Sequence, residues 1–334
     1  MAGAICQSNK DIPIDMTLGN LLYYSLADMK ITEKELIDLF AMNNIPVSYI
    51  RKISAPDAFR RASSSIKNRT MLIVDPNNTN ENLKIKIEVD EVKSDSDGVT
   101  RIIGRKVIDE DNEEVSYEQI AELIYSRDNN TVAYNLKNSD VINTMEYSKL
   151  CMEVQDKFDE WSVYHTKDTI RNTILRIIND THPVSLTPTG LCKFVPRTHT
   201  DLLYSLKEAL GDMEHFCQNS GEHNFMEIIP VINTEEQQTL IKDASTRELK
   251  EELFGFTQEL KEVLQARQTL PARTVSSYLE RFKTLSNKVS DYEGLLGNYL
   301  GFLKVQITDA VSLIKDNSED NEDSEEEPVY VRIH

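Results

Sequence analysis

The sequence predicts an α+β protein: N-terminal helices and an antiparallel β-meander, then a helix-hairpin-helix-strand module, then a long antiparallel helical hairpin forming a coiled coil. Three patterns support this class. Apolar and polar residues alternate over 83–89, as they do in half-buried strands. Apolar residues recur at helical spacing over 170–178. A heptad repeat extends over 275–313, which is typical of helices packed side by side.

Composition indicates a globular chain of several domains. The 334 residues are 40 % hydrophobic and 28 % charged, which is enough to bury a core. Acidic residues outnumber basic ones 56 to 37, for a formal charge of −19. This charge disfavours nucleic acid as a partner, because neutralising phosphates requires clustered Lys and Arg. The nearest approaches to basic patches, DAFRRASSS and YHTKDTIRNTILRII, are interpreted as solvated helix faces.

The sequence also indicates the compartment. The first residues, MAGAICQSNKDIPID, lack the cationic and apolar regions of a signal peptide, and no apolar run reaches the roughly 18 residues of a membrane span. Four scattered cysteines, Cys6, Cys151, Cys192 and Cys217, predict free thiols and not a disulfide framework. We therefore expect a cytoplasmic protein without a membrane partner.

Residues 1–140 are predicted to form a first domain of helices followed by strands. Residues 17–46 carry two helical patterns, TLGNLLYYSLADM and TEKELIDLFAMNNIP, and Thr32 and Glu35 form a capping box before the second. A third short helix is expected near Pro56.

The strands of this domain begin near Thr70. Residues 83–89 and 99–108 predict a hairpin around the turn KSDSDG, whose Gly98 is expected to supply a positive φ. VSYEQIAELIYS and TVAYNLK continue the antiparallel meander, although YEQIAELI also fits one or two helical turns.

Residues 141–232 are predicted to form a compact mixed module. Helices are expected over 143–181, two short strands around a turn over 184–195, a helix over 199–213 and a strand over 225–232.

Residues 233–316 are predicted to form an antiparallel helical hairpin. With Val275 at position a of the heptad, the a and d positions through Leu313 are apolar except Gln306, which predicts one helix of roughly 60 Å. An upstream helical pattern and the turn at Pro271 supply the second, antiparallel helix.

Three glycines lie within the predicted long helix, away from its heptad seam, and an acidic tail follows the helix. Gly294, Gly297 and Gly301 each cost about 1 kcal/mol relative to Ala inside a helix, so we expect a second helix to pack closely on the smooth strip they form. Residues 317–334 are expected to be a disordered acidic tail whose end, PVYVRIH, docks as a strand or peptide on a partner or on the chain's own sheet.

Cys and His residues gather in one stretch, which raises the question of a metal site. The candidate ligands are Cys192, His199, His215, Cys217 and His223. Zinc sites commonly use paired ligands two to four residues apart, and none of these spacings matches that pattern. We therefore favour the interpretation that they are residues of a strand pair, a helix start and a polar loop.

Other chemistry has weaker support. No Gly-rich phosphate loop is present, so no cofactor is expected. The alternative to a binding protein is an enzyme that processes nucleic acid or nucleotides. Its pocket would be lined by Arg171, Arg176, His182 and the hairpin from Cys192 to His199.

Three short segments resemble a known family. LGNLLYYSLADMKIT, PDAFRRA and GLCKFVP are together similar to an uncharacterised family of bacterial and bacteriophage proteins, a domain of unknown function, over residues 17–230. The resemblance implies a phage or mobile-element context, and so the host cytoplasm. It implies no reaction and no catalytic residues.

The long heptad seam, without a catalytic motif, predicts a non-enzymatic assembly protein that binds other proteins, including a second copy of itself. The expected interface consists of seam residues Phe282, Leu285, Val289, Tyr292, Leu296, Tyr299 and Leu303. A further possibility within the binding class is an acidic phage inhibitor that occupies the nucleic-acid surface of a host defence factor.

Overall fold

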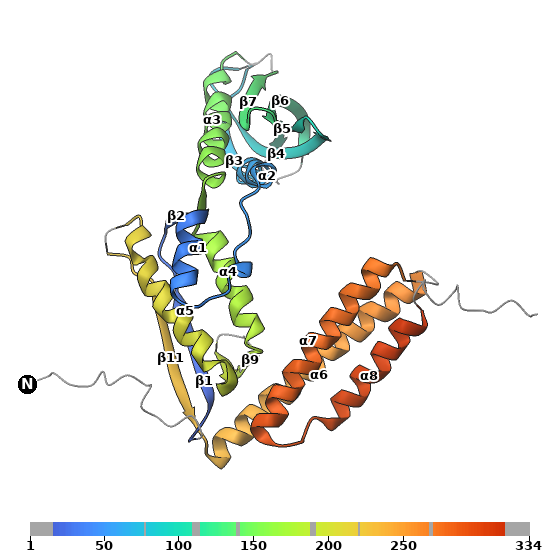
Figure 1. The fold of residues 1–334 in the computed structure, drawn as a ribbon. Coiled ribbons are helices and arrows are strands. Elements are labelled where there is room, and N and C mark those ends of the chain that lie inside the picture. The colour runs from blue at the N-terminus through green and yellow to red at the C-terminus, as the bar shows by residue number, and fades with distance from the viewer. Residues whose placement is uncertain are drawn as a thin grey trace, which may run out of the picture.

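The computed structural model describes residues 16–76, 78–108, 114–137, 141–187, 192–219, 221–266 and 270–317. These residues form the α+β fold that the sequence predicts, held by three hydrophobic clusters. Figure 1 shows a curved sheet with two helices at one end, a central body, and a group of long helices at the other end. We call these parts the sheet module, the central body and the bundle.

The central body is built on a four-stranded antiparallel sheet in the order β11–β1–β10–β9. Its strands are β1 (Thr17–Ser25), β9 (Val184–Ser185), β10 (Lys193–Pro196) and β11 (Phe225–Ile232). Its helices are α1 (Glu33–Met42), α4 (Lys167–Asp180) and α5 (Thr200–Asp212). Successive residues of β10 face opposite sides: Phe194 packs with the bundle, and Val195 packs with these three helices.

The helix predicted for TLGNLLYYSLADM is wrong, because its first nine residues form strand β1. β1 pairs with β10 on one side and β11 on the other, so sheet hydrogen bonds override the local helical preference. Gly19 allows β1 and β10 to approach closely, since a Cβ there would lie 2.1 Å from the Val195 carbonyl oxygen. The next helix is confirmed, with both halves of the capping box between Thr32 and Glu35 present at α1.

The sheet module contains the predicted meander, five antiparallel strands in sequence order. They are β3 (Thr70–Val74), β4 (Asn82–Ser94), β5 (Gly98–Ile108), β6 (Glu114–Ser126) and β7 (Thr131–Leu136). The predicted hairpin is β4–β5, and YEQIAELI is strand and not helix. Helices α2 (Ala55–Ser64) and α3 (Thr144–Trp161) share the hydrophobic cluster of this sheet.

Gly98 stands at the start of β5 for a reason other than the predicted positive φ. Among the described residues, the glycines with positive φ are Gly221 and Gly297. A Cβ at Gly98 would lie 2.0 Å from the Tyr125 carbonyl oxygen, so the close approach of β6 requires glycine there.

Short elements join the sheet module to the central body. The chain leaves through the 3₁₀ turn η3 (Val47–Tyr49) and returns through β8 (Tyr164–Thr166), which pairs with β2 (Lys30–Thr32). Two further 3₁₀ turns flank α5, namely η4 (Arg197–His199) and η5 (Met213–Phe216).

The bundle consists of α6 (Glu235–Ala266), α7 (Ala272–Leu296) and α8 (Gly301–Asp316). The predicted antiparallel pair is α6 and α7, but the single long helix over 275–313 is wrong. The backbone turns at Gly297, with φ of 86°, and α8 runs back beside the other two helices (Figure 1). Within 235–266 and 270–317 the result is a three-helix bundle and not a coiled coil.

The break at Gly297 also rotates the register of the last helix. Beyond Leu303, α8 buries Ile307 and Ile314, where the heptad pattern predicted Gln306 and Leu313. This rotation explains why Gln306 interrupted the predicted seam.

The prediction that a second helix packs closely on the glycines of the bundle is not met within the described chain. A Cβ at Gly294 or Gly297 would meet no atom within 4 Å. The predicted acidic tail beyond Asn317, the turn at 188–190 and Cys6 lie outside the described residues.

Candidate functional site

A cleft of about 770 Å³ lies where the sheet module meets the central body. Its walls are the segment 51–54, the first turns of α2 and α4, strand β8, and Trp161 at the end of α3. Such a cleft between two modules is a common place for a small-molecule site.

The cleft is basic, although the chain carries a net charge of −19. Its lining includes the cations Arg51, Lys52, Arg61 and Arg176 and the acids Asp57 and Asp168. Asp57 forms a salt bridge of 3.3 Å with Arg60, a residue that does not line the cleft. The four lining cations form no salt bridge with any described residue, so their charge is available to an anion.

Two helix N-termini add to this positive potential. Helix α2 begins after Ser54 and helix α4 after Thr166, and at neither end does the capping side chain accept a backbone N–H. The first turns of both helices reach the cleft through Asp57 and Ala58 of α2 and through Asp168 and Thr169 of α4. Free N–H groups and the positive end of the helix dipole favour an anion at such positions.

His165 places an unpaired polar atom in the cleft wall. Its side chain is buried, with 3 % relative exposure, and its Nε2 has no hydrogen-bond partner among the described residues. Burial lowers the pKa of His165, and the positive charge of Arg61 lowers it further against the opposing effect of Glu33. The imidazole is therefore neutral at pH 7, and a ligand that pairs with Nε2 would relieve the cost of this buried atom.

Neighbouring residues fix the positions of the Arg176 and Arg61 side chains. Arg176 donates to the Tyr49 carbonyl oxygen, while its buried Nε has no partner among the described residues. Burial lowers the pKa of Arg176, and the neighbouring Arg51 charge lowers it further. The Arg61 guanidinium lies over the Trp161 ring, 4.7 Å from its centroid.

The residues of the predicted enzyme pocket are divided between separate places. Arg176 lines the basic cleft, whereas Arg171 lines a different hollow beside β1. His182 and His199 meet at the opposite, bundle-facing side of the central body, where both contact Asp291 of α7. Asp291 lies off the heptad seam and was not among the predicted site residues.

The histidine pair and Asp291 form a compact group. His182 Nδ1 lies 2.6 Å and His199 Nε2 lies 3.0 Å from the same carboxylate oxygen, Asp291 Oδ2. The two imidazole rings meet edge to face, with centroids 5.3 Å apart. Among the described residues this is the group whose geometry could hold a metal ion.

The other predicted metal ligands do not join it. Cys192 lies just before β10, and His215 and Cys217 lie in and just after η5. His223 lies in the loop before β11, where its Nδ1 is hydrogen-bonded to Glu214. Of the five candidates, His199 alone belongs to a potential metal-binding group in the described chain.

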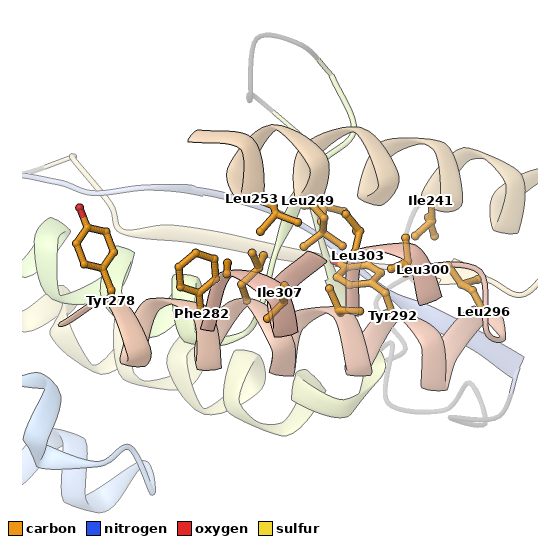
Figure 2. Close-up of a cluster of buried hydrophobic side chains, with 14 of the residues drawn as sticks. Ile241, Leu249, Leu253, Tyr278, Phe282, Tyr292, Leu296, Leu300, Leu303 and Ile307 are labelled. Atoms are coloured by element: carbon orange, nitrogen blue, oxygen red, sulfur yellow. The ribbon is translucent and has the colours of Figure 1, made fainter. Parts of the chain in front are cut away.

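The predicted interface residues lie in the core of the bundle. Buried side chains of α7 and α8 there are Phe282, Leu285, Val289, Tyr292, Leu296 and Leu303. Tyr299 is half-buried, and its hydroxyl is 2.6 Å from Ser245 Oγ. Figure 2 shows Leu249 and Leu253 of α6 directed toward the helix that carries Phe282 and Tyr292. The helices of one chain therefore already cover the seam.

The fold and cleft together define a modular α+β protein with a basic cleft between two of its modules. The model of a family of unknown function, DUF6744, matches residues 17–319, and the chain belongs to this family. The match confirms the resemblance seen over 17–230 and extends it through the bundle. No curated protein and no solved structure matches the chain. Among the described helices, none is both long and apolar enough to span a membrane.

Proposed function

We propose that the chain is a binding protein whose main site is the basic cleft and whose ligand is a phosphate-bearing small molecule. The observation that carries this proposal is a cleft whose lining holds four cations without a salt bridge among the described residues, together with His165, whose buried Nε2 has no hydrogen-bond partner there. The first turns of α2 and α4 end at the same cleft, and the N-cap side chain of neither helix bonds a backbone N–H, so free first-turn N–H groups are available to a ligand there. Phosphate oxygens accept hydrogen bonds from guanidinium, ammonium and backbone N–H groups, and from His165 in the tautomer that carries the proton on Nε2.

Size and charge favour a small ligand over a polymer. A cleft of about 770 Å³ falls within the range of roughly 300–1,000 Å³ that small-molecule sites occupy. A polyanion would extend beyond the cleft onto a surface that belongs to a chain of net charge −19, where it would be repelled. The local positive charge supports recognition of one or a few phosphates.

We propose binding in preference to catalysis because the lining side chains supply charge and hydrogen bonds. The thiols give little support to a nucleophilic mechanism. Burial raises the pKa of Cys151 to about 12 inside the sheet module, and burial also raises the pKa of Cys217. A nucleotide-processing enzyme remains the alternative within the same ligand class.

Fluorescence of Trp161 offers a direct test, since this is the chain's one tryptophan and it lines the cleft. Titration of the full chain with pyrophosphate and with each nucleoside triphosphate at low ionic strength should give a saturable change for at least one of them. Arg51→Gln should weaken that binding by about tenfold or more, since a hydrogen bond to a charged group contributes about 1.5–3 kcal/mol.

Arg273→Gln is the matched control, because it removes the same charge from an exposed position in the bundle. It should leave the affinity unchanged. The proposal fails if none of the probes binds at millimolar concentration. It also fails if both substitutions weaken binding equally, since the effect would then reflect net charge.

Self-association is a second candidate function, supported by exposed aromatic and aliphatic side chains on the outside of the bundle. Phe254 is 65 % exposed, Val305 is 61 % exposed and Phe302 is 43 % exposed. Lys250 lies over the Phe302 ring and one helical turn before Phe254, which brings the two rings to the same side. We propose that a second copy of the chain covers them, in place of the buried seam.

Sedimentation velocity of the full chain over a range of concentrations tests this second candidate. A dimer that Phe254→Ser weakens would support it, whereas a monomer at every concentration would exclude it. An acidic phage protein that inhibits a host factor remains a further proposal within the binding class.

A further inference from the structure

Three metal-ligating side chains from three separate elements meet between the central body and the bundle. His182 lies between α4 and β9, His199 ends η4, and Asp291 lies on α7. Their ligand atoms, one from each residue, lie within 4.8 Å of one another. We propose that these residues bind one first-row divalent transition metal ion, of which zinc is the best fit.

The donor set selects this class of ion. Two imidazole nitrogens with one carboxylate oxygen suit zinc and its neighbours, whereas magnesium and calcium prefer oxygen ligands throughout. Ligand atoms around a tetrahedral zinc ion lie about 3.3 Å apart, given bonds of about 2.0–2.1 Å. The 2.6 and 3.0 Å separations from Asp291 Oδ2 are close to this, so small side-chain movements would admit the ion.

The backbone holds His182 in an unusual conformation that points its ring into the group. Its φ is +52°, and the other described non-glycine residues with positive φ are all asparagines. Its N–H donates to Asn179 O at 3.1 Å, and its carbonyl oxygen accepts from the Tyr292 hydroxyl at 3.0 Å. Tyr292 is fully buried and directly follows Asp291, so the same contact fixes two of the three ligands.

The group is partly accessible to solvent. The side chains of His182, His199 and Asp291 are 14 %, 22 % and 26 % exposed. Three protein ligands with partial solvent access leave the fourth tetrahedral position to water or to an incoming group. The ion would also tie α7 to the central body, because its ligands come from both.

Zinc titration of the full chain, in competition with a chromophoric chelator, tests the site. We expect one tightly bound ion per chain and no competition from magnesium. Asp291→Asn keeps the shape of the side chain but removes its charge, and His199→Gln removes a nitrogen ligand. Each should weaken binding by at least about 100-fold, since even substitutions of outer-shell partners cost about 10–100-fold.

His215→Gln is the control, because it removes an exposed histidine outside the group. This substitution should leave the tight binding of one zinc ion unchanged. Cobalt binding adds an independent readout: visible bands without a thiolate charge-transfer band indicate nitrogen and oxygen ligands, whereas a thiolate band would place the ion on Cys192 or Cys217 and overturn the proposal.

Thermal unfolding separates a metal site from a purely hydrogen-bonded group. Zinc should raise the unfolding temperature of the wild type and of His215→Gln, but not that of the two ligand variants. Circular dichroism of each variant without metal establishes that it is folded. If folded Asp291→Asn and His199→Gln both bind zinc as tightly as the wild type, or if the wild type binds none, the group is only a hydrogen-bonded link.

Discussion

Two glycines of the bundle, Gly294 and Gly297, lie three residues apart and should respond oppositely to substitution by alanine. Gly294 is inside helix α7 and exposed, and no atom lies within 4 Å of the position that an alanine Cβ would take. Gly297 follows the helix with φ of 86° and ψ of 172°, a combination that is essentially restricted to glycine. If α7 and α8 were one continuous helix, alanine would instead be stabilising at both positions.

The magnitudes follow from these two conformations. Gly294→Ala should stabilise the bundle by about 1 kcal/mol, because alanine is the better helix former by that amount. Gly297→Ala should destabilise it by about 1–3 kcal/mol, because a side chain there is forced into a disfavoured backbone region. The free energies of unfolding of the two variants should therefore differ by about 2–4 kcal/mol.

Hydrogen exchange of peptides from α7 and α8 is the suitable assay, because it reports the local stability of the bundle separately from the other modules. Exchange of buried amides near Leu285 should slow in Gly294→Ala and accelerate in Gly297→Ala. Equal slowing in both variants would refute the break at Gly297 and restore the single long helix.

Three further predictions concern the cores and one ion pair. Phe282→Asp should unfold the bundle, at a cost of at least about 3 kcal/mol by urea denaturation, whereas Lys283→Asp at an exposed position should cost little. Hydrogen bonds from Arg69 lower the pKa of Glu153 to about 2. The ionised Glu153 carboxylate therefore stabilises the folded state fully above its unfolded pKa of about 4.3, and this stabilisation is lost as the pH falls toward 2. In Glu153→Gln the midpoint of urea unfolding should depend less on pH across that window. Cys151, buried and with its pKa raised to about 12, should react with a thiol reagent only after unfolding, as peptide mapping would show.

Local signals predicted many elements of the fold correctly. The capping box of Thr32 and Glu35 starts α1, and the alternation from Leu83 to Val89 marks β4 of the meander. These signals depend on residues a few positions apart, so the sequence displays them directly. The helix predicted at β1 is wrong because the strand partners of β1 lie 171–215 residues away, beyond the reach of any local pattern.

The candidate sites were harder to predict from the sequence than the helices and strands. The basic cleft combines Arg51 and Arg61 from one passage of the chain with Arg176 from another. Each cation lies in a segment that, taken alone, fits a solvated helix face or loop. The metal-binding group depends on Asp291, whose helix contributes it from a position that the heptad pattern assigns to the surface.

Periodicity, capping and turn residues act over short distances, and from them the α+β class, the strand meander and helices α1, α2 and α5 could be predicted. The end of α7 and the reversal by which α8 buries Ile307 and Ile314 depend on contacts among the three helices of the bundle. The tertiary structure also decided which charges meet: Arg61 and Arg176 in the cleft, and His182 with Asp291 beside the bundle. A long-range contact depends on how whole helices and strands pack against one another, and no short stretch of residues encodes that packing.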